Sequence, residues 1–209
     1  MRLMLGLPAG LLALASAVVP ASAADDSAPP AGFSALFDGK TLDGWKPVNT
    51  KDNFFVKDGI LVMNRGSGWL ATEKTFGDFE LRVRYRFITP GTDSGIFIRS
   101  GLEGSNWTSH GYQVQNMDNE TLGKFFPMGK GVKVQGEHRP NLVKEVKKPP
   151  GGEWQDLTIQ AVGKHGEVTL NGKQVATTDD LTIADGHIGL QAEGGVLEFQ
   201  RIDIKPLTP

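Results

Sequence analysis

The chain has 209 residues, with 22 basic and 24 acidic side chains and a formal net charge of −2. A nucleic-acid-binding protein is expected to be clearly basic with a clustered patch, and the basic runs here are short, so we expect no nucleic-acid partner. There is no cysteine. Disulfides and an acylated lipoprotein are therefore excluded, and the fold is expected to rely on its hydrophobic core.

The N-terminus has the pattern of a secretory signal peptide. Arg2 precedes an apolar stretch from Leu3 to Val19, and Ala21-Ser22-Ala23 supplies a small-residue cleavage site. A retained membrane anchor is the less favoured alternative, and no second long apolar segment follows. We therefore expect an exported protein, periplasmic or secreted, with no membrane span after cleavage. The predicted division is a signal peptide over 1–23, a flexible leader over 24–32 and a single domain over 33–209.

Three consecutive strand patterns suggest a surface built for a ligand. Apolar and charged residues alternate strictly over 79–87, which predicts a strand with one buried and one charged face. GIFIRS and GYQVQ follow, and alternation places Arg99, Gln113 and Gln115 on the faces away from the core. Sheets that bury one face and offer polar groups on the other commonly bind sugars. We therefore expect one polar sheet face formed by these strands.

The rest of the chain is predicted to be all-β. Short strand patterns recur from Phe33 to the C-terminus, no segment keeps a 3.6-residue apolar period, and 27 glycines with 12 prolines favour turns. Asn171-Gly172 lies between two strand patterns and predicts a type I′ hairpin. The section 116–152 has weak alternation and is expected to be loop-rich. About eleven short strands in one domain predict two packed sheets, a sandwich or jelly roll.

Several motifs, in chain order, carry a resemblance to a known family. They are FSALFDGKTLDGW, FGDFELRVRYRF, GIFIRS followed by GYQVQ, VTLNGKQV and GHIGLQAEGGVLEFQRIDIKPL. Together they resemble the 3-keto-disaccharide hydrolase family, over roughly 33–207. The resemblance implies a concanavalin-like jelly-roll sandwich of two antiparallel sheets with very little helix. It also implies an exported enzyme that cleaves 3-keto-glycosides in a cleft on the polar sheet face.

The implied reaction sets requirements on the site. A ketone at C3 acidifies the hydrogen on C2, so a general base can remove that hydrogen and the enolate can expel the glycosidic oxygen at C1. Water can then add to the unsaturated ketone, which gives net hydrolysis. Such a site needs a base, hydrogen-bond donors or a metal at the carbonyl oxygen, and an acid at the leaving oxygen.

Four residues are the candidates for these catalytic roles. Arg99 ends the GIFIR strand, and its planar fork can hold a carbonyl or two sugar hydroxyls, although a salt bridge to Glu80 or another acid is the alternative. Asp118 matches a carboxylate that the family often has there, and it is a base, a cation ligand or a turn cap. His138 is the histidine best placed to titrate near neutral pH in a cleft. Glu80, on the charged face of the 79–87 strand, completes the set.

Five residues are candidates for substrate binding. Gln113 and Gln115 share one strand face, where ligand contact and plain surface polarity are both open. Family members commonly have Glu where Gln113 stands, and an amide cannot serve as a base. This departure leaves the base unsettled and keeps a non-catalytic, lectin-like carbohydrate-binding module as the alternative function. Arg84 is central in its strand, Trp107 can stack on a sugar ring, and His110 lies near it.

No cofactor is firmly predicted. No two histidines stand at a metal-ligand spacing, so a dedicated zinc site has little support. A divalent cation held through Asp118, Asp93 or Glu137 remains possible, although no loop signature for it is present. The identity of any metal is therefore left unknown.

Overall fold

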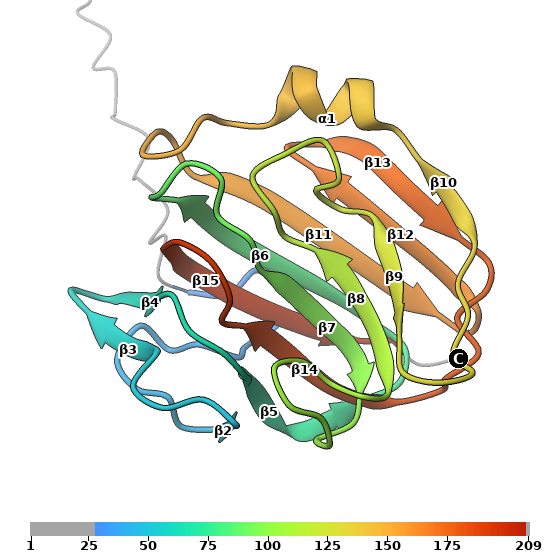
Figure 1. Cartoon of the computed structure of the whole chain (residues 1–209), viewed down its shortest axis with the longest axis horizontal. Helices are drawn as coiled ribbons and strands as arrows, with labels where there is room; N and C mark the ends of the chain where they lie inside the picture. The colour runs from blue at the N-terminus through green and yellow to red at the C-terminus, as the bar shows by residue number, and fades with distance from the viewer. Residues whose placement is uncertain (1–27, 208–209) are drawn as a thin grey trace, which may run out of the picture.

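A computed structural model of the protein describes residues 28–207 as two antiparallel sheets packed face to face (Figure 1). This confirms the all-β, two-sheet prediction. One short helix is present among the described residues, α1 (Pro140–Val146). The predicted signal peptide, 1–23, lies outside the described residues. No helix within 28–207 has the length and apolar character needed to cross a membrane.

The larger sheet has nine strands in the order β10-β13-β12-β11-β6-β15-β4-β3, with β1 paired to β15. The strands of this sheet are β1 (Ser34–Ala35), β3 (Phe54–Lys57), β4 (Ile60–Met63), β6 (Phe79–Phe87), β10 (Gly136–His138), β11 (Gln155–Val162), β12 (His165–Leu170), β13 (Lys173–Thr178) and β15 (Leu197–Pro206).

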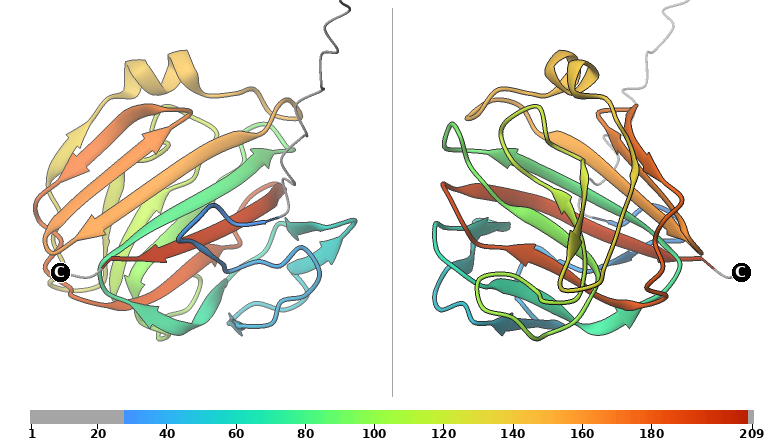
Figure 2. Two further views of the ribbon diagram at one scale, coloured as in Figure 1. Left: turned by 180° about the vertical axis from the view of Figure 1, so that it is seen from behind. Right: turned by 45° about the vertical axis from the view of Figure 1, so that its right-hand side comes forward.

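The smaller sheet has six strands in the order β2-β5-β14-β7-β8-β9. These strands are β2 (Trp45–Val48), β5 (Trp69–Phe76), β7 (Gly95–Ser100), β8 (Gly111–Gln115), β9 (Phe125–Met128) and β14 (Gly186–Gln191). Figure 2 shows the two layers from behind and at an angle.

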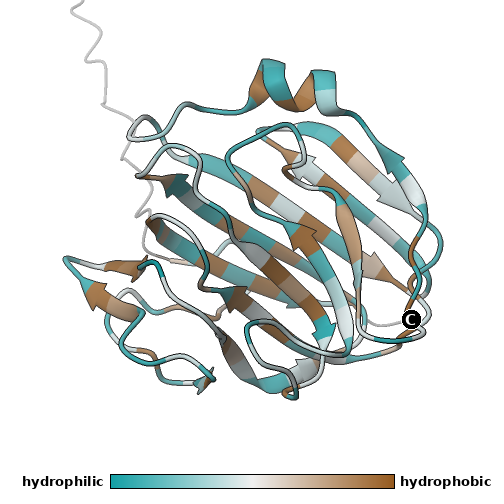
Figure 3. Ribbon diagram, in the orientation of Figure 1, coloured by the Kyte–Doolittle hydropathy of each residue, from teal (hydrophilic) through white to brown (hydrophobic). Residues whose placement is uncertain are grey.

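The core lies between the two sheets and follows the predicted alternation. Along β6, the apolar residues are at most 1% exposed, whereas the charged residues between them reach the surface. Figure 3 shows this alternation as hydrophobic and hydrophilic bands along the strands. Ile96 and Ile98 of β7, and Tyr112 and Val114 of β8, fill the same core from the other sheet.

The pairing of strands corrects one expectation. β6 belongs to the nine-stranded sheet, whereas β7 and β8 belong to the six-stranded sheet. Because the two sheets bury their inner faces against each other, the charged face of β6 and the polar face of β8 point to opposite outer surfaces. The single polar face expected from these three strands is therefore wrong, and each sheet has its own outer surface.

Two local predictions concern the hairpin at Asn171-Gly172 and the section 116–152. The hairpin between β12 and β13 is confirmed, with Asn171 at φ 48° and Gly172 at φ 79°, both in the left-handed region that this turn requires. The section 116–152 is loop-rich as expected, and it also contains three short elements, β9, β10 and α1. α1 has seven residues, with Pro140 in its first turn and Val143 as its one buried residue. A helix this short does not show a 3.6-residue apolar pattern in the sequence.

Candidate active site on the six-stranded sheet

A row of hydrogen-bonded side chains crosses the outer face of the six-stranded sheet. Gln113 Nε2 donates to Gln115 Oε1, and Gln115 Nε2 donates to Asp93 Oδ1 at 2.9 Å. Gly95 is paired with Gln115 on the neighbouring strand. A Cβ at Gly95 would lie 2.6 Å from Gln113 Cδ, so the missing side chain lets Gln113 lie across β7.

A second carboxylate lies beside this row. Gln191 Nε2, at the end of β14, donates to Glu193 Oε2 at 2.8 Å. Asp93 and Gly194 exchange backbone hydrogen bonds of 3.2 and 2.9 Å, which places the segment of Glu193 directly against Asp93. We call Asp93, Gln113, Gln115, Gln191 and Glu193 the acid–amide cluster.

Both carboxylates of the cluster hold protons more strongly than free side chains do. Burial raises the pKa of Asp93, and hydrogen bonds from the Gln115 side chain and the Ser94 backbone partly offset this. Burial also raises the pKa of Glu193, and the negative charge of Asp93 raises it further. Two neighbouring carboxylates whose pKa values are both raised can divide the roles of base and acid.

An apolar floor lies next to the acid–amide cluster. Trp69 and Phe97 meet edge to face with ring centroids 5.9 Å apart, and Gly189 lies between them on β14. A Cβ at Gly189 would come within 2.9 Å of the Phe97 ring, so glycine allows this close packing. Trp69 is fully buried, and its Nε1 has no partner among the described residues.

The edge strand β9 completes the outer face. Phe126 is paired with Gln113 on β8, and Lys124 Nζ lies 5.1 Å from the centre of the Phe126 ring. The backbone of Lys124 also accepts a hydrogen bond from the Gln115 N–H at 2.9 Å. This edge therefore adds one cation and one partly exposed aromatic ring beside the two glutamines.

The structure buries Arg99 instead of presenting it to solvent. Arg99 has φ 46°, which interrupts the alternation of β7, and its side chain is 0% exposed. Its guanidinium donates to the carbonyls of Gly77, Gly163 and Ile183 at 2.7 to 3.0 Å and forms an ion pair with Asp78. These contacts join three chain segments and leave the guanidinium out of reach of a substrate. The alternative prediction, a salt bridge to an acid, therefore describes Arg99, and the acid is Asp78.

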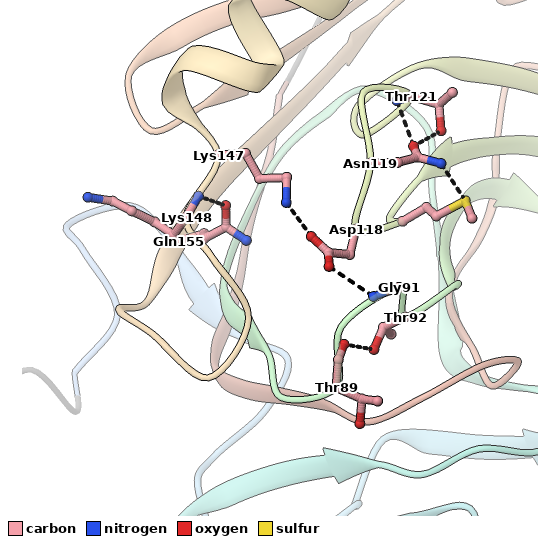
Figure 4. Close-up of polar contacts among 10 residues, drawn as sticks. Thr89, Gly91, Thr92, Asp118, Asn119, Thr121, Lys147, Lys148 and Gln155 are labelled. Atoms are coloured by element: carbon pink, nitrogen blue, oxygen red, sulfur yellow. Dashed lines mark hydrogen bonds and ion pairs between the residues drawn. The ribbon is translucent and has the colours of Figure 1, made fainter.

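Asp118 also joins chain segments (Figure 4). Its Oδ1 pairs with Lys147 just after α1, and its Oδ2 accepts the Gly91 N–H at 3.0 Å. The side chain is 7% exposed. Asp118 therefore takes the turn-ordering role among its three predicted alternatives, and it connects the loop after β8 with the β6–β7 turn and the end of α1.

Glu80 and Arg84 lie on the opposite side of the molecule from Gln113. Glu80 pairs with Arg82 at 2.7 Å on the outer face of the nine-stranded sheet. Arg84, on the same face, has a long contact of 3.9 Å with Asp156. Neither residue can act on a ligand bound at the acid–amide cluster, because the core separates the two surfaces.

The remaining candidates are spread around the fold. Trp107, 47% exposed, and His110 lie in the β7–β8 loop, at the end of β7 remote from Asp93. His138 lies on edge strand β10 of the other sheet, where its Nε2 is 3.1 Å from the Leu122 carbonyl oxygen. Burial lowers the pKa of His138, which favours its neutral form. The structure therefore brings together Gln113 and Gln115 from the predicted set.

The carboxylates of the expected cation ligands have other partners. Asp118 lies close to Asp93 along the backbone, since its N–H donates to the Thr92 carbonyl at 2.9 Å, but its carboxylate is paired with Lys147. Glu137 contacts Arg139 at 3.7 Å on the other sheet. Within residues 28–207, no group of three or more His, Asp or Glu side chains is placed to hold a metal ion.

Gln191 and Glu193 are the residues of the cluster that sequence reasoning missed. Alternation along GHIGLQAEGG puts Leu190 in the core and sets Gln191 and Glu193 on the outer face. The same period-2 rule that identified Gln113 and Gln115 applies here, so the pattern predicts the outer face for both residues but not their contact with Asp93.

Comparison with known proteins agrees with a carbohydrate-active class on a concanavalin-like sandwich. Residues 32–205 match the sequence family described as the 3-keto-alpha-glucoside-1,2-lyase-like domain, and the chain belongs to this family. A curated relative, 3-keto-disaccharide hydrolase from Bacteroides thetaiotaomicron, is 27% identical over 154 residues, which cover 61% of this chain and 52% of the relative. The chain thus spans about half the length of that relative.

Solved structures show the same fold at low sequence identity. A candidate glycosyl hydrolase from Parabacteroides distasonis matches with a TM-score of 0.64 and 20% identity, covering 85% of this chain and 94% of that one. The carbohydrate-binding module CBM66 from Bacillus subtilis matches with a TM-score of 0.61 and 17% identity, covering 78% and 95%. Because one is described as a hydrolase and the other as a binding module, these likenesses establish the sandwich and leave the choice of activity to the site.

Proposed function

We propose that this protein is an exported enzyme that cleaves 3-keto-glycosides at the acid–amide cluster. The observation that carries the proposal is the convergence of Asp93 and Glu193, two carboxylates with raised pKa values, on one outer sheet face. Membership of the 3-keto-alpha-glucoside-1,2-lyase-like family supports the substrate class. The N-terminal pattern of residues 1–23 supports export.

In the proposed reaction, Asp93 is the general base. Its carboxylate removes the proton from C2, which the C3 ketone has acidified, and the electron pair forms an enolate. Gln115 holds Asp93 Oδ1 through a 2.9 Å hydrogen bond and so fixes the direction of the carboxylate. A carboxylate with a raised pKa is the stronger base, which suits the removal of a carbon-bound proton.

Glu193 is proposed as the general acid. When the enolate collapses, the bond between C1 and the glycosidic oxygen breaks, and the leaving oxygen takes the proton from Glu193. The Gln191 amide, 2.8 Å from Glu193 Oε2, holds the acid in place. Water then adds at C1 of the unsaturated ketone and gives its proton to Glu193, while Asp93 returns its proton to C2, so both carboxyl groups regain their starting states. The sum is hydrolysis with no net oxidation or reduction.

Gln113 is proposed to bind the substrate ketone. Its Nε2 uses one of two N–H groups on Gln115, which leaves one donor for an oxygen that gains negative charge in the enolate. An amide needs no change of protonation for this role. The presence of Gln in place of the family's common Glu is therefore compatible with catalysis when Asp93 supplies the base.

The test is a turnover assay with 3-keto-trehalose, with and without a chelator and with divalent metals added back. Chromatography and mass spectrometry would measure release of the unmodified glucose half and of the 3-keto sugar. We expect both products in equal amounts, and release of neither from unoxidised trehalose. Binding of glycans without turnover under every metal condition would overturn the proposal in favour of a lectin-like module.

A further inference from the structure

A pocket of about 260 Å³ opens on the outer face of the nine-stranded sheet, on the side of the sandwich opposite the acid–amide cluster. Three adjacent strands, β11, β6 and β15, form its base, and they lie side by side in the view from behind in Figure 2. The polar side chains around it are Arg82, Arg84, Asp156, Thr158, Arg201 and Asp203.

The N-terminal segment forms one wall of this pocket. Pro30 lines it, Arg201 donates to the Ala28 carbonyl at 2.9 Å, and the guanidinium of Arg82 lies 4.3 Å from the centre of the Phe33 ring. The described end of the expected flexible leader therefore packs on the sheet. The pocket therefore has a wall and a base, and hydrogen bonds and ion pairs fix several of the side chains that line it.

Two arginines stand next to each other at the base. Arg84 of β6 and Arg201 of β15 are direct cross-strand partners. Like charges at such a pair of positions repel, which destabilises the sheet unless an anion lies between or beside them. Arg201 has such a partner, because its Nη2 lies 2.7 Å from Asp203 Oδ2.

Arg84 has no comparably close acid. Its contact with Asp156 is 3.9 Å long, and its Nε is buried with no hydrogen-bond partner among residues 28–207. Its neighbours on the same strand face differ, because Arg82 pairs with Glu80 and Arg86 pairs with Glu198, both at 2.7 Å. The Arg84 side chain as a whole is 37% exposed, so its guanidinium has no acid within hydrogen-bond distance among the described residues and is partly open to an acceptor in the pocket.

We propose that this pocket is a second binding site, for a sugar that carries a carboxylate, such as a hexuronic acid. The carboxylate would accept from the Arg84 fork, because a planar guanidinium binds a carboxylate with two parallel hydrogen bonds. Asp156, opposite Arg84, and Thr158, opposite Arg82, are partners for ring hydroxyls, and Pro30 offers an apolar surface. The volume is below the roughly 300–1,000 Å³ of sites for drug-sized ligands, which suits one sugar ring.

The acids around the pocket limit the ligand to a single negative charge. Three arginines and two aspartates line the pocket, so its side chains carry a net of one positive charge, which one carboxylate balances and a dianion such as a sugar phosphate exceeds. This inference goes beyond the proposed function and does not depend on it, because the pocket and the acid–amide cluster lie on opposite outer faces.

The test is binding of methyl β-D-glucuronide, measured by NMR titration of the protein without any keto substrate. We expect the largest shifts at Val83 and Thr158, with binding that weakens as salt is added. Methyl β-D-glucoside, which lacks the carboxylate, and acetate, which lacks the ring, should each bind at least about tenfold more weakly, since each loses one set of contacts.

Matched arginine variants locate the site. Arg84→Gln should weaken binding of the glucuronide at least about tenfold. Arg86→Gln, two residues along the same face but outside the pocket, should leave binding within about twofold. Equal binding of glucoside and glucuronide, equal binding of acetate and glucuronide, or an Arg84→Gln variant that binds as the native protein does would each overturn the proposal.

Discussion

Arg99 Nη2 lies 2.9 Å from Asp78 Oδ1, and the same carboxylate oxygen accepts the Gly163 N–H at 2.9 Å. This pair joins the end of β7 to the β5–β6 turn and the β11–β12 turn. The two sheets of the sandwich are thereby connected at one end through a charged group that solvent does not reach. Arg99 is a determinant of stability by this geometry.

Replacing Arg99 by Ala should lower the free energy of unfolding by about 3 kcal/mol, because the change removes the guanidinium that pairs with Asp78 and donates to three carbonyl groups. Urea unfolding followed by circular dichroism would measure it. Arg139→Ala is the control, since its contact with Glu137 is exposed and 3.7 Å long, and it should cost under about 1 kcal/mol. If Arg99→Ala kept the stability of the native protein but lost turnover of 3-keto-trehalose, Arg99 would be a catalytic residue instead.

We expect the two carboxylates of the acid–amide cluster to lower the stability of the folded protein at pH 7. Because the folded pKa values of Asp93 and Glu193 are raised, the folded state binds more protons than the unfolded chain above about pH 4, so their contribution to stability is lost as pH rises through the folded pKa values. The double variant Asp93→Asn, Glu193→Gln should therefore melt at a higher temperature than the native protein at pH 7.

That difference should shrink toward pH 3.5, where both carboxylates are mostly protonated in the folded and in the unfolded state. Calorimetry at the two pH values would measure it. Glu153→Gln is a matched change at an exposed carboxylate, whose pKa Lys148 lowers, so this control should show no gain at pH 7. A double variant that is less stable than the native protein at pH 7 would contradict the raised pKa values.

His138 should give the opposite dependence on pH. Burial lowers its folded pKa, so its contribution to stability is complete above about pH 6.5 and is lost as pH falls through the folded pKa. His138→Gln should keep a donor for the Leu122 carbonyl and reduce the difference in stability between pH 7.5 and pH 5. NMR titration of the imidazole would check the direction, and a midpoint above 6.5 would refute it.

The sequence predicted the sandwich because its strands obey period-2 alternation, as β6 and the hairpin at Asn171 show. It did not predict which sheet each strand joins. Adjacent strands in sequence, β6 and β7, lie in different sheets, and alternation within a strand carries no information about that choice. For this reason the prediction placed the polar face of β8 and the charged face of β6 on one surface, whereas they lie on different sheets.

The site was predicted in part for similar reasons. Gln113 and Gln115 were placed correctly on the outer face because β8 is regular. Arg99 was placed on that face because alternation was extended through it, whereas its left-handed φ turns the side chain inward. Glu193 enters the cluster through the pairing of Gly194 with Asp93, a contact between segments about one hundred residues apart, which one sequence does not reveal.

The central claim is that Asp93 acts as the base for cleavage of a 3-keto-glycoside. The most direct measurement is kcat/KM for 3-keto-trehalose with Asp93→Asn, which keeps the acceptor for Gln115 and removes the base. The account predicts a loss of at least about a hundredfold, with Glu153→Gln unchanged. Activity of Asp93→Asn within about twofold of the native enzyme, with the fold intact by circular dichroism, would contradict the claim.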